Sequence, residues 1–265
     1  MKTKAILGIA LLSFVAAVSC KKDEDGPLTS ITYQGETYKV VQLADGKYWM
    51  AENLRYVPEG LTVSDDVNNI TGVWYPVTTD GTDMTFDKTA VAKAGYLYSA
   101  DVAFGEAVTA DNFDKFAKVR GICPEGWHIP DFDDWFTLLG HTSNSKVIPD
   151  DPDAPYYDAD LKGYGSIEKA AADGLVFPVT GMVSVANKSA VKGTLSGAIG
   201  KAPDKKMNME YVLGSSAYQA VKDKNSGEIT NFQYYSAMTH RANGTVHVAY
   251  SGYRFGCAVR CVKDN

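Results

Sequence analysis

The sequence predicts a single α+β domain with an antiparallel sheet at its core, two short helices and long loops. Three observations lead to this expectation. Short alternating strands with turn residues between them open the folded part, one capped helix follows near the middle, and alternating apolar residues return near the end. No repeat of fixed period and no internal linker divides the chain, so we expect one domain over residues 28–265.

Composition and charge exclude some classes of protein. The chain has 265 residues, of which 45% are hydrophobic and 22% are charged, so it can bury a full-sized core. The formal net charge is -6, and lysines and arginines cluster no further than in pairs. A surface that neutralises phosphates needs the opposite charge. We therefore expect no nucleic-acid partner.

The N-terminus is typical of a bacterial lipoprotein. Lys2 and Lys4 precede an apolar run over residues 5–18, and small residues then lead into Cys20. The run is shorter than the ~20 residues of a membrane-spanning helix, so residues 1–19 are predicted to be a cleaved signal peptide. Their end resembles a lipobox, which predicts lipidation at Cys20 and a membrane as partner. The alternative is ordinary secretion, with Cys20 as a disulfide partner.

Residues 20–27 predict a flexible acidic tether, because they are charged and offer nothing to bury. An acidic run directly after the lipid-bearing cysteine resembles the signal that moves Bacteroidetes lipoproteins to the outer face of the outer membrane. We therefore expect a lipid-anchored outer-membrane protein that faces the cell exterior. The alternative is a solvated spacer on a lipoprotein that faces the periplasm.

The folded part is predicted to open with a three-stranded meander. Its strands are expected over three short runs of β-forming residues, separated by Gln-Gly and Asp-Gly turns: residues 31–33, 38–43 and 48–50. The composition of residues 60–95 is mostly that of a loop, with a short helix expected over residues 85–94.

Two more helices and a closing hairpin are expected after the loop. Asp131 is a suitable N-cap and Gly140 stands where a helix ends, which predicts a helix over residues 132–139. The same signals predict a second helix over residues 166–173. Strands are expected over residues 175–179, 245–250 and 254–262, the last two paired as a hairpin. Segments rich in Gly, Asn and Ser, around residues 140–165 and 186–210, are expected to be long loops.

Four separated motifs carry a resemblance to a known family. They are residues 48–55, residues 95–98, residues 121–130 with Trp135, and residues 258–264. In this order they resemble the Fibrobacter succinogenes major paralogous domain of Bacteroidetes lipoproteins, over nearly all of residues 30–264. The Gly-Trp-His-Ile-Pro block before a helix also resembles the C-type-lectin-like and formylglycine-generating-enzyme fold. The resemblance implies one C-type-lectin-like domain whose two ends meet in a sheet beside two helices.

The resemblance also implies a disulfide between Cys123 and Cys261, because the family has a cysteine at each position. Disulfides persist in the oxidising compartment that the signal predicts. Cys257 would then be a small buried hydrophobic residue. A bridge between Cys123 and Cys257 remains the competing pairing.

The sequence contains no catalytic constellation that we recognise. Gly-x-Ser-x-Gly, His-Glu-x-x-His and phosphate-loop motifs are absent, so we expect neither catalytic residues nor an enzyme. The runner-up is an oxidase of the formylglycine-generating type, which would need a reactive pair of Cys257 and Cys261. Four residues along a strand separate them by ~13 Å, beyond disulfide reach.

Metal binding is weakly indicated at one place. The acidic segment 150–160 could supply oxygens to Ca²⁺, but it lacks the order of an EF-hand. A solvated acidic loop is the simpler interpretation. The calcium and sugar signatures of classical C-type lectins are also absent, so no cofactor is expected.

Sixteen tyrosines, six of them after residue 210, are the remaining functional indication. Tyrosine offers a flat apolar face with a polar handle, which suits stacking on sugar rings and protein contacts; it is also simply common in strands. We expect a surface binding or adhesion module for a glycan or a host or surface protein, with contacts in loops 140–165 and 186–235. Candidate contact residues are Tyr156, Tyr157 and Tyr218. A structural subunit of a surface assembly is the other alternative.

Overall fold

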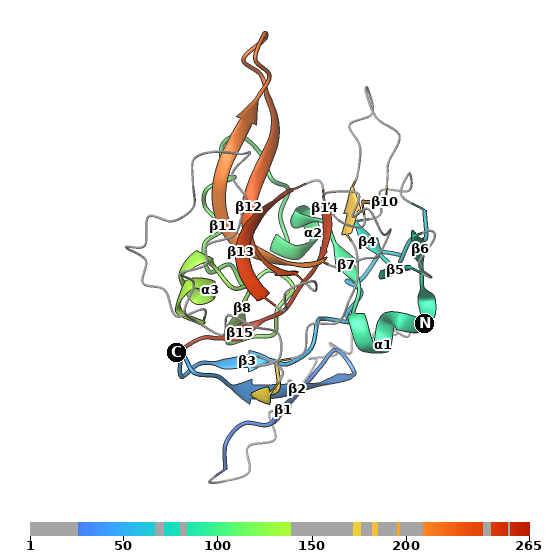
Figure 1. Ribbon diagram of the computed structural model, residues 1–265, viewed down its shortest axis with the longest axis vertical. Helices are drawn as coiled ribbons and strands as arrows, with labels where there is room; N and C mark the ends of the chain where they lie inside the picture. Colours follow the sequence, from blue (N-terminus) through green and yellow to red (C-terminus); the bar gives the residue numbers. More distant parts are fainter. Residues whose placement is uncertain are drawn as a thin grey trace, which may run out of the picture.

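Antiparallel sheets and a few short helices build the described part of the protein (Figure 1). The structure is a computed structural model, and it describes residues 26–66, 72–79, 84–138, 172–175, 182–184, 195–196, 209–240, 245–253 and 255–265. Over these ranges the architecture is the mixed α+β class that the sequence predicts.

The two ends of the domain meet in one five-stranded sheet. Its strands lie in the order β1 (Ser30–Tyr33), β2 (Glu36–Gln42), β3 (Tyr48–Met50), β15 (Val262–Lys263) and β8 (Trp127–His128). The first three strands form the predicted meander, and the last strand of the chain pairs with β3 on one side and β8 on the other. The meeting of the two ends in a sheet is therefore confirmed.

A larger sheet of eight strands lies above the first (Figure 1). Its main path runs β10, β9, β14, β11, β12 and β13, and β7 joins β14 to β4 at the side. The bounds are β4 (Val73–Trp74), β7 (Leu97–Tyr98), β9 (Met182–Ser184), β10 (Leu195–Ser196), β11 (Met209–Lys222), β12 (Ile229–His240), β13 (Thr245–Gly252) and β14 (Phe255–Ala258). A separate small hairpin consists of β5 (Val77–Thr79) and β6 (Met84–Phe86).

Four short helical segments lie in the described residues: η1 (Lys88–Ala90), α1 (Val91–Ala94), α2 (Ala100–Phe104) and α3 (Phe132–Leu138). The predicted helix over 132–139 is confirmed as α3. Asp131 accepts from the backbone N–H of Asp134, and Asp134 accepts in return from that of Asp131, both at 2.9 Å. The helix predicted over 85–94 starts later than expected, because β6 occupies residues 85 and 86; helical structure begins with η1 at Lys88 and continues through α1 to Ala94. The predicted helix over 166–173 lies almost wholly outside the described residues.

The predicted hairpin of the last two strands is wrong. β13 pairs with β12 over eight residue pairs, from Gln233 with Gly252 to His240 with Thr245. β14 instead lies between β9 and β11 and also contacts β7. Moreover, the predicted strand over 254–262 is two strands, because the chain leaves the sheet between Ala258 and Val262. Alternation along a strand indicates which side chains are buried but does not identify the neighbouring strand.

The expectation of a loop over residues 186–235 is also wrong for its second half. Residues 209–222 and 229–240 are the two longest strands that the structure describes. Their alternation is disguised in the sequence by register shifts after Leu213, after Ala217 and near Lys222. At Gly214 a Cβ atom would come within 2.2 Å of the backbone oxygen of Tyr235, so this strand needs a glycine where the two backbones approach most closely.

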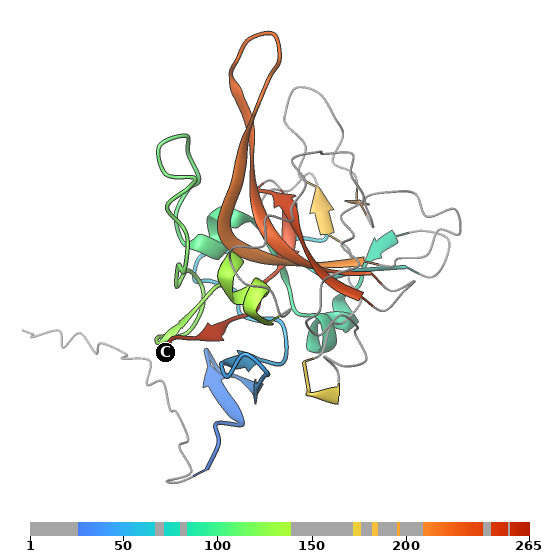
Figure 2. The same cartoon turned by 60° about the vertical axis from the view of Figure 1, so that its left-hand side comes forward.

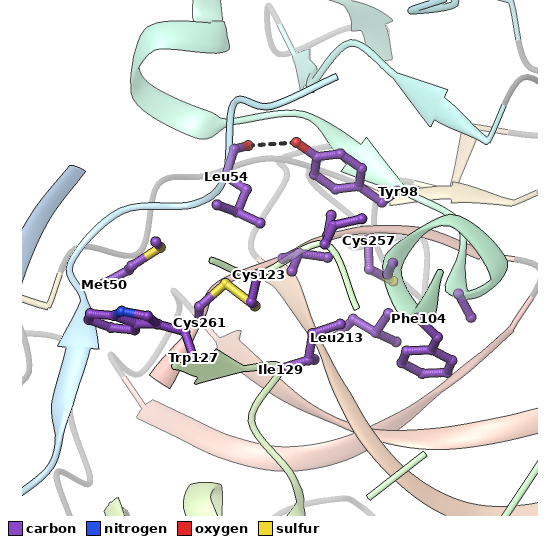
Figure 3. Close-up of a cluster of buried hydrophobic side chains, with 14 of the residues drawn as sticks. Met50, Leu54, Tyr98, Phe104, Cys123, Trp127, Ile129, Leu213, Cys257 and Cys261 are labelled. Atoms are coloured by element: carbon purple, nitrogen blue, oxygen red, sulfur yellow. Dashed lines mark hydrogen bonds between the residues drawn. A yellow bond between two sulfur atoms is a disulfide. The ribbon is translucent and has the colours of Figure 1, made fainter. Parts of the chain in front are cut away.

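The core is arranged around a disulfide between Cys123 and Cys261, whose Cα atoms lie 5.9 Å apart. Figure 3 shows this bridge among the side chains of Met50, Leu54 and Trp127, with Cys257 on the far side of the cluster near Phe104. All of these side chains are buried. The bridge therefore fastens the loop before β8 to the last turn of the chain.

Candidate functional site

A partly buried polar network lies where the two ends of the domain meet. Imidazole Nε2 of His128 lies 2.9 Å from Oδ2 of Asp134, and Nδ1 lies 2.5 Å from Oδ1 of Asp264. Nζ of Lys47 donates to Oδ1 of Asp134 at 2.5 Å. The network thus joins the β2–β3 turn, β8, the first turn of α3 and the C-terminal residues.

Hydrogen bonds in this network outweigh the effect of burial on its charges. Burial alone would lower the pKa of His128, but its bonds to Asp134 and Asp264 raise it. Burial alone would raise the pKa of the fully buried Asp134, but bonds from His128, Lys47 and the backbone of Asp131 hold it well below its usual range. The hydrogen bonds therefore favour the charged form of each group.

This geometry leaves His128 without a nitrogen for chemistry. An ionised carboxylate can only accept hydrogen bonds, so an imidazole between two of them donates from both ring nitrogens. Such an imidazolium has no lone pair with which to take a proton from a substrate or to bind a metal. The network resembles a catalytic cluster in composition but acts as a structural clamp.

β11 and β12 form a ribbon that projects from the rest of the described residues (Figures 1 and 2). Every side chain from Lys222 to Ile229 at its tip is exposed. The tip is ordered by Oδ1 of Asp223, which accepts the backbone N–H groups of Asn225 and Ser226, both at 2.8 Å. We define the ribbon as residues 215–236. Its tip therefore has a defined backbone conformation that is stabilised by hydrogen bonds.

One face of the ribbon packs onto the domain. The ring of Phe232 stacks on that of Phe113, with centroids 5.0 Å apart, and also lies 5.2 Å from that of Tyr253. The hydroxyl of the buried Tyr234 donates to the backbone oxygen of Phe113 at 2.8 Å. A two-stranded ribbon alone is marginally stable in water. These contacts therefore explain why the ribbon is stable where it projects from the rest of the domain.

The opposite face carries an aromatic row of three half-buried rings: Phe132, Tyr235 and Tyr218. The ring centroids of Phe132 and Tyr235 are 4.4 Å apart, and those of Tyr235 and Tyr218 are 5.3 Å apart. Further out, the side-chain amides of Gln219 and Gln233 bond across the strands at 2.7 Å. This row leads from the start of α3 onto the ribbon and could contact a ligand with flat apolar faces.

The predicted site residues divide between described and undescribed parts of the chain. Tyr218 lies on β11 in the aromatic row. Tyr156, Tyr157, the acidic segment 150–160 and Cys20 lie outside the described residues. In the ranges that the structure does describe, no group of three or more His, Cys, Asp or Glu side chains could hold a metal ion, and no helix there is long and apolar enough to cross a membrane.

Sequence reasoning missed the partners of Tyr218. Tyr234 and Tyr235 are adjacent in sequence, and in a strand adjacent side chains point to opposite faces. Tyr234 is accordingly buried and Tyr235 half-buried in the aromatic row. This alternation could have identified Tyr235 had residues 229–240 been recognised as a strand, whereas Phe132 is brought there only by the tertiary packing of α3.

Comparison with known proteins gives one match. A protein family described as the Fibrobacter succinogenes major domain matches residues 44–263. No curated protein matches the chain, and no solved structure does. The match begins after β1 and β2, although both strands belong to the same sheet as β3. The structural unit therefore extends to Ser30, beyond the matched range.

Proposed function

This chain belongs to the Fibrobacter succinogenes major domain family, and from that premise we propose that it is a lipid-anchored, non-catalytic binding module. Lipidation at Cys20, a tether over residues 20–27 and display on the outer face of the outer membrane are parts of this proposal. The ligand is a glycan or a protein of the surroundings. The ribbon and its aromatic row make the contact.

The position of the ribbon carries the proposal. Figures 1 and 2 show the first described residues, 26–29, at one end of the molecule and the tip of the β11–β12 ribbon at the other. A domain held by a flexible tether at its N-terminal end would, on average, keep this tip farther from the membrane than its other end. An ordered, exposed element at that place is well situated to meet a ligand outside the cell.

The scaffold is proposed to be C-type-lectin-like. The meeting of both chain ends in one sheet supports this, as do the disulfide near the end of the chain and the second sheet that carries the ribbon. Folds of this kind serve many functions, so the scaffold alone does not identify the ligand.

We propose that the protein is not an enzyme because of the bonds that its cysteines and His128 make. Cys261 is bonded to Cys123 and both are fully buried, so Cys261 is not poised to act with Cys257 as the formylglycine-generating reaction type would require. His128 is held by two carboxylates. Among the described residues, the cysteines and His128 are the candidates for catalytic groups that we considered.

The proposal is tested with the full chain, purified from detergent-solubilised envelopes and applied to an array of glycans and host-matrix proteins, with and without Ca²⁺. Saturable binding that is weakened by Tyr218→Ala supports it. The absence of binding to every probe, together with a stoichiometric partner in cell-surface pull-downs, would instead favour a structural subunit of a surface assembly. Binding that requires Ca²⁺ would assign a role to the acidic segment 150–160.

A further inference from the structure

A second group of aromatic side chains lies on a different part of the surface from the ribbon. We define the tyrosine face as the half-buried Tyr56, Tyr75 and Tyr96, the buried Tyr33 against which Tyr56 packs, and three charged side chains, Glu36, Glu52 and Arg55. The rings form two edge-to-face pairs, Tyr33 with Tyr56 at 5.4 Å and Tyr75 with Tyr96 at 5.9 Å. The motifs of the family resemblance include Glu52, Arg55 and Tyr96, but they did not indicate that these side chains lie together.

The segment after β3 holds the two pairs together. The backbone oxygen of Leu54 accepts from the N–H of Tyr96 at 3.0 Å, and that of Tyr56 accepts from the buried hydroxyl of Tyr98 at 2.8 Å. At Gly95 a Cβ atom would come within 2.6 Å of the backbone oxygen of Leu54. Only a glycine therefore allows these two segments of the backbone to lie this close together. The backbone that carries Tyr56 and Tyr96 is therefore held in place, which lowers the entropy lost when a ligand binds.

Charged groups between the pairs are held in place by one arginine. Arg55 lies over the ring of Tyr38, donates from Nε to Glu36 at 3.1 Å and from Nη1 to Glu52 at 3.4 Å, and gives Nη2 to a backbone oxygen. Glu36 pairs across the β1–β2 turn with Tyr33, and its charge contributes to the raised pKa of Tyr96, after burial and Tyr75. Glu36 therefore lies between the two tyrosine pairs.

Several polar atoms of the tyrosine face remain available to a ligand. The hydroxyls of Tyr56, Tyr75 and Tyr96 bond to no residue that the structure describes, although their rings are half-buried. Glu36 and Glu52 each use only Oε2, and their side chains are 49% and 35% exposed. The face thus combines flat apolar surfaces with hydroxyl donors and carboxylate acceptors.

From these contacts we infer that the tyrosine face is a binding site for a neutral saccharide. Sugar rings present C–H groups that pack on aromatic faces, and hydroxyls that bond to carboxylates and phenols. All three nitrogens of Arg55 are already engaged, and Lys88, beside Tyr75, is paired with Asp65 at 2.6 Å. Of the residues that define the face, Glu36 and Glu52 are anions and the one cation, Arg55, is already engaged, so the face should bind neutral glycans in preference to those that carry a sulfate or a uronic acid. This site is separate from the ribbon and does not depend on it.

Binding to defined oligosaccharides tests the inference. The full chain is titrated with neutral hexamers of glucose, mannose and N-acetylglucosamine, and with anionic hexamers of heparin and polygalacturonate. We expect saturable binding of at least one neutral hexamer and none of the anionic ones. Tyr96→Ala should weaken that binding about tenfold. Tyr96→Phe keeps the ring and removes the hydroxyl, so it measures the contribution of each. Glu125→Ala, at an exposed position outside both the ribbon and the tyrosine face, should leave the binding unchanged.

A second measurement uses the unaltered protein, in case Tyr96→Ala does not fold. Nitration by tetranitromethane, mapped by mass spectrometry, should modify Tyr56, Tyr75 and Tyr96, and the bound hexamer should protect these three but not Tyr218. Binding of no neutral hexamer, preference for an anionic one, or protection at the ribbon alone would overturn the inference. The last result would leave the ribbon as the ligand site, so the two proposals fail separately.

Discussion

The guanidinium of Arg260 donates to the side-chain oxygen of Asn53 from two of its nitrogens, Nη2 at 2.9 Å and Nε at 3.2 Å. Both residues are buried, with exposed fractions of 0% and 1%. Nη1 donates in addition to the backbone oxygen of Ala51 at 3.3 Å. One planar group near the end of the chain thereby fixes the segment after β3, from which the tyrosine face is built.

Replacing Asn53 with Leu should strongly destabilise the protein. It removes the acceptor of two N–H groups of a buried guanidinium without letting water in. Leaving a buried donor unsatisfied costs about 1–3 kcal/mol, and more when the donor is charged. Asn225→Leu, on the exposed tip of the ribbon, should change the free energy of unfolding by less than about 0.5 kcal/mol. Denaturant unfolding measures both. Equal effects of the two variants would contradict the role of Asn53.

The two cysteines of the C-terminal region should respond differently to replacement. Cys261→Ser opens the bridge to Cys123, which spans a sequence separation of 138 residues. Closing a loop of that length stabilises by about 5 kcal/mol in the chain-entropy model. Cys257→Ser should cost only the substitution of a buried thiol. Non-reducing peptide mapping of the exported protein should find Cys123 joined to Cys261, and a bridge from Cys123 to Cys257 would refute this pairing.

The clamp at His128 should make stability depend on pH. Because the pKa of His128 is raised in the folded state, its contribution is complete below the unfolded value of about 6.5 and is lost as the pH rises through the folded value. The lowered pKa of Asp134 acts in the opposite direction, since that contribution is lost only in acid.

We therefore propose to measure the free energy of unfolding by denaturant, between pH 6 and pH 9, for the unaltered protein and for His128→Gln. The difference in the free energy of unfolding should be largest at pH 6 and shrink towards pH 9, since the neutral imidazole keeps a donor for only one of the two carboxylates. A difference that stays constant over this range would show that folding does not raise the pKa of His128.

Local signals predicted correctly those elements whose contacts are local. Asp131 and Asp134 cap α3 within a single turn, and the meander of β1 to β3 is closed by short turns. The partner of β14 could not be predicted, because β7, β9 and β11 come from distant parts of the chain. The ribbon was hidden by its bulges near Gly214.

The same difference between local and distant contacts decides which candidate sites could be predicted from the sequence. Tyr218 was found because tyrosines are frequent in the last part of the sequence. The tyrosine face was not found, because its rings come from β1, the segment after β3, the residue after β4 and the residue before β7. Only the bonds of Leu54, Arg55 and Tyr98 bring them together.

Lipid attachment at Cys20 is tested by metabolic labelling with a palmitate analogue. The unaltered protein should carry the label and sediment with membranes. Cys20→Ala should lose the label, because the thiol at the cleavage point is the proposed acceptor. Cys257→Ala serves as the matched control and should be labelled normally. Equal labelling of the Cys20 variant would contradict lipid attachment at Cys20. The proposed position of the ribbon relative to the membrane would then lose its support.

The central claim, that the ribbon is the ligand-contacting element of a tethered module, is tested most directly by one comparison of affinities. For a ligand identified on the array, the dissociation constant is measured for the full chain, for Tyr218→Ala, and for Lys93→Ala on the exposed surface of α1. The account predicts binding about tenfold weaker for Tyr218→Ala, as expected for the loss of an aromatic contact, and unchanged for Lys93→Ala. Equal affinity in all three proteins would contradict it.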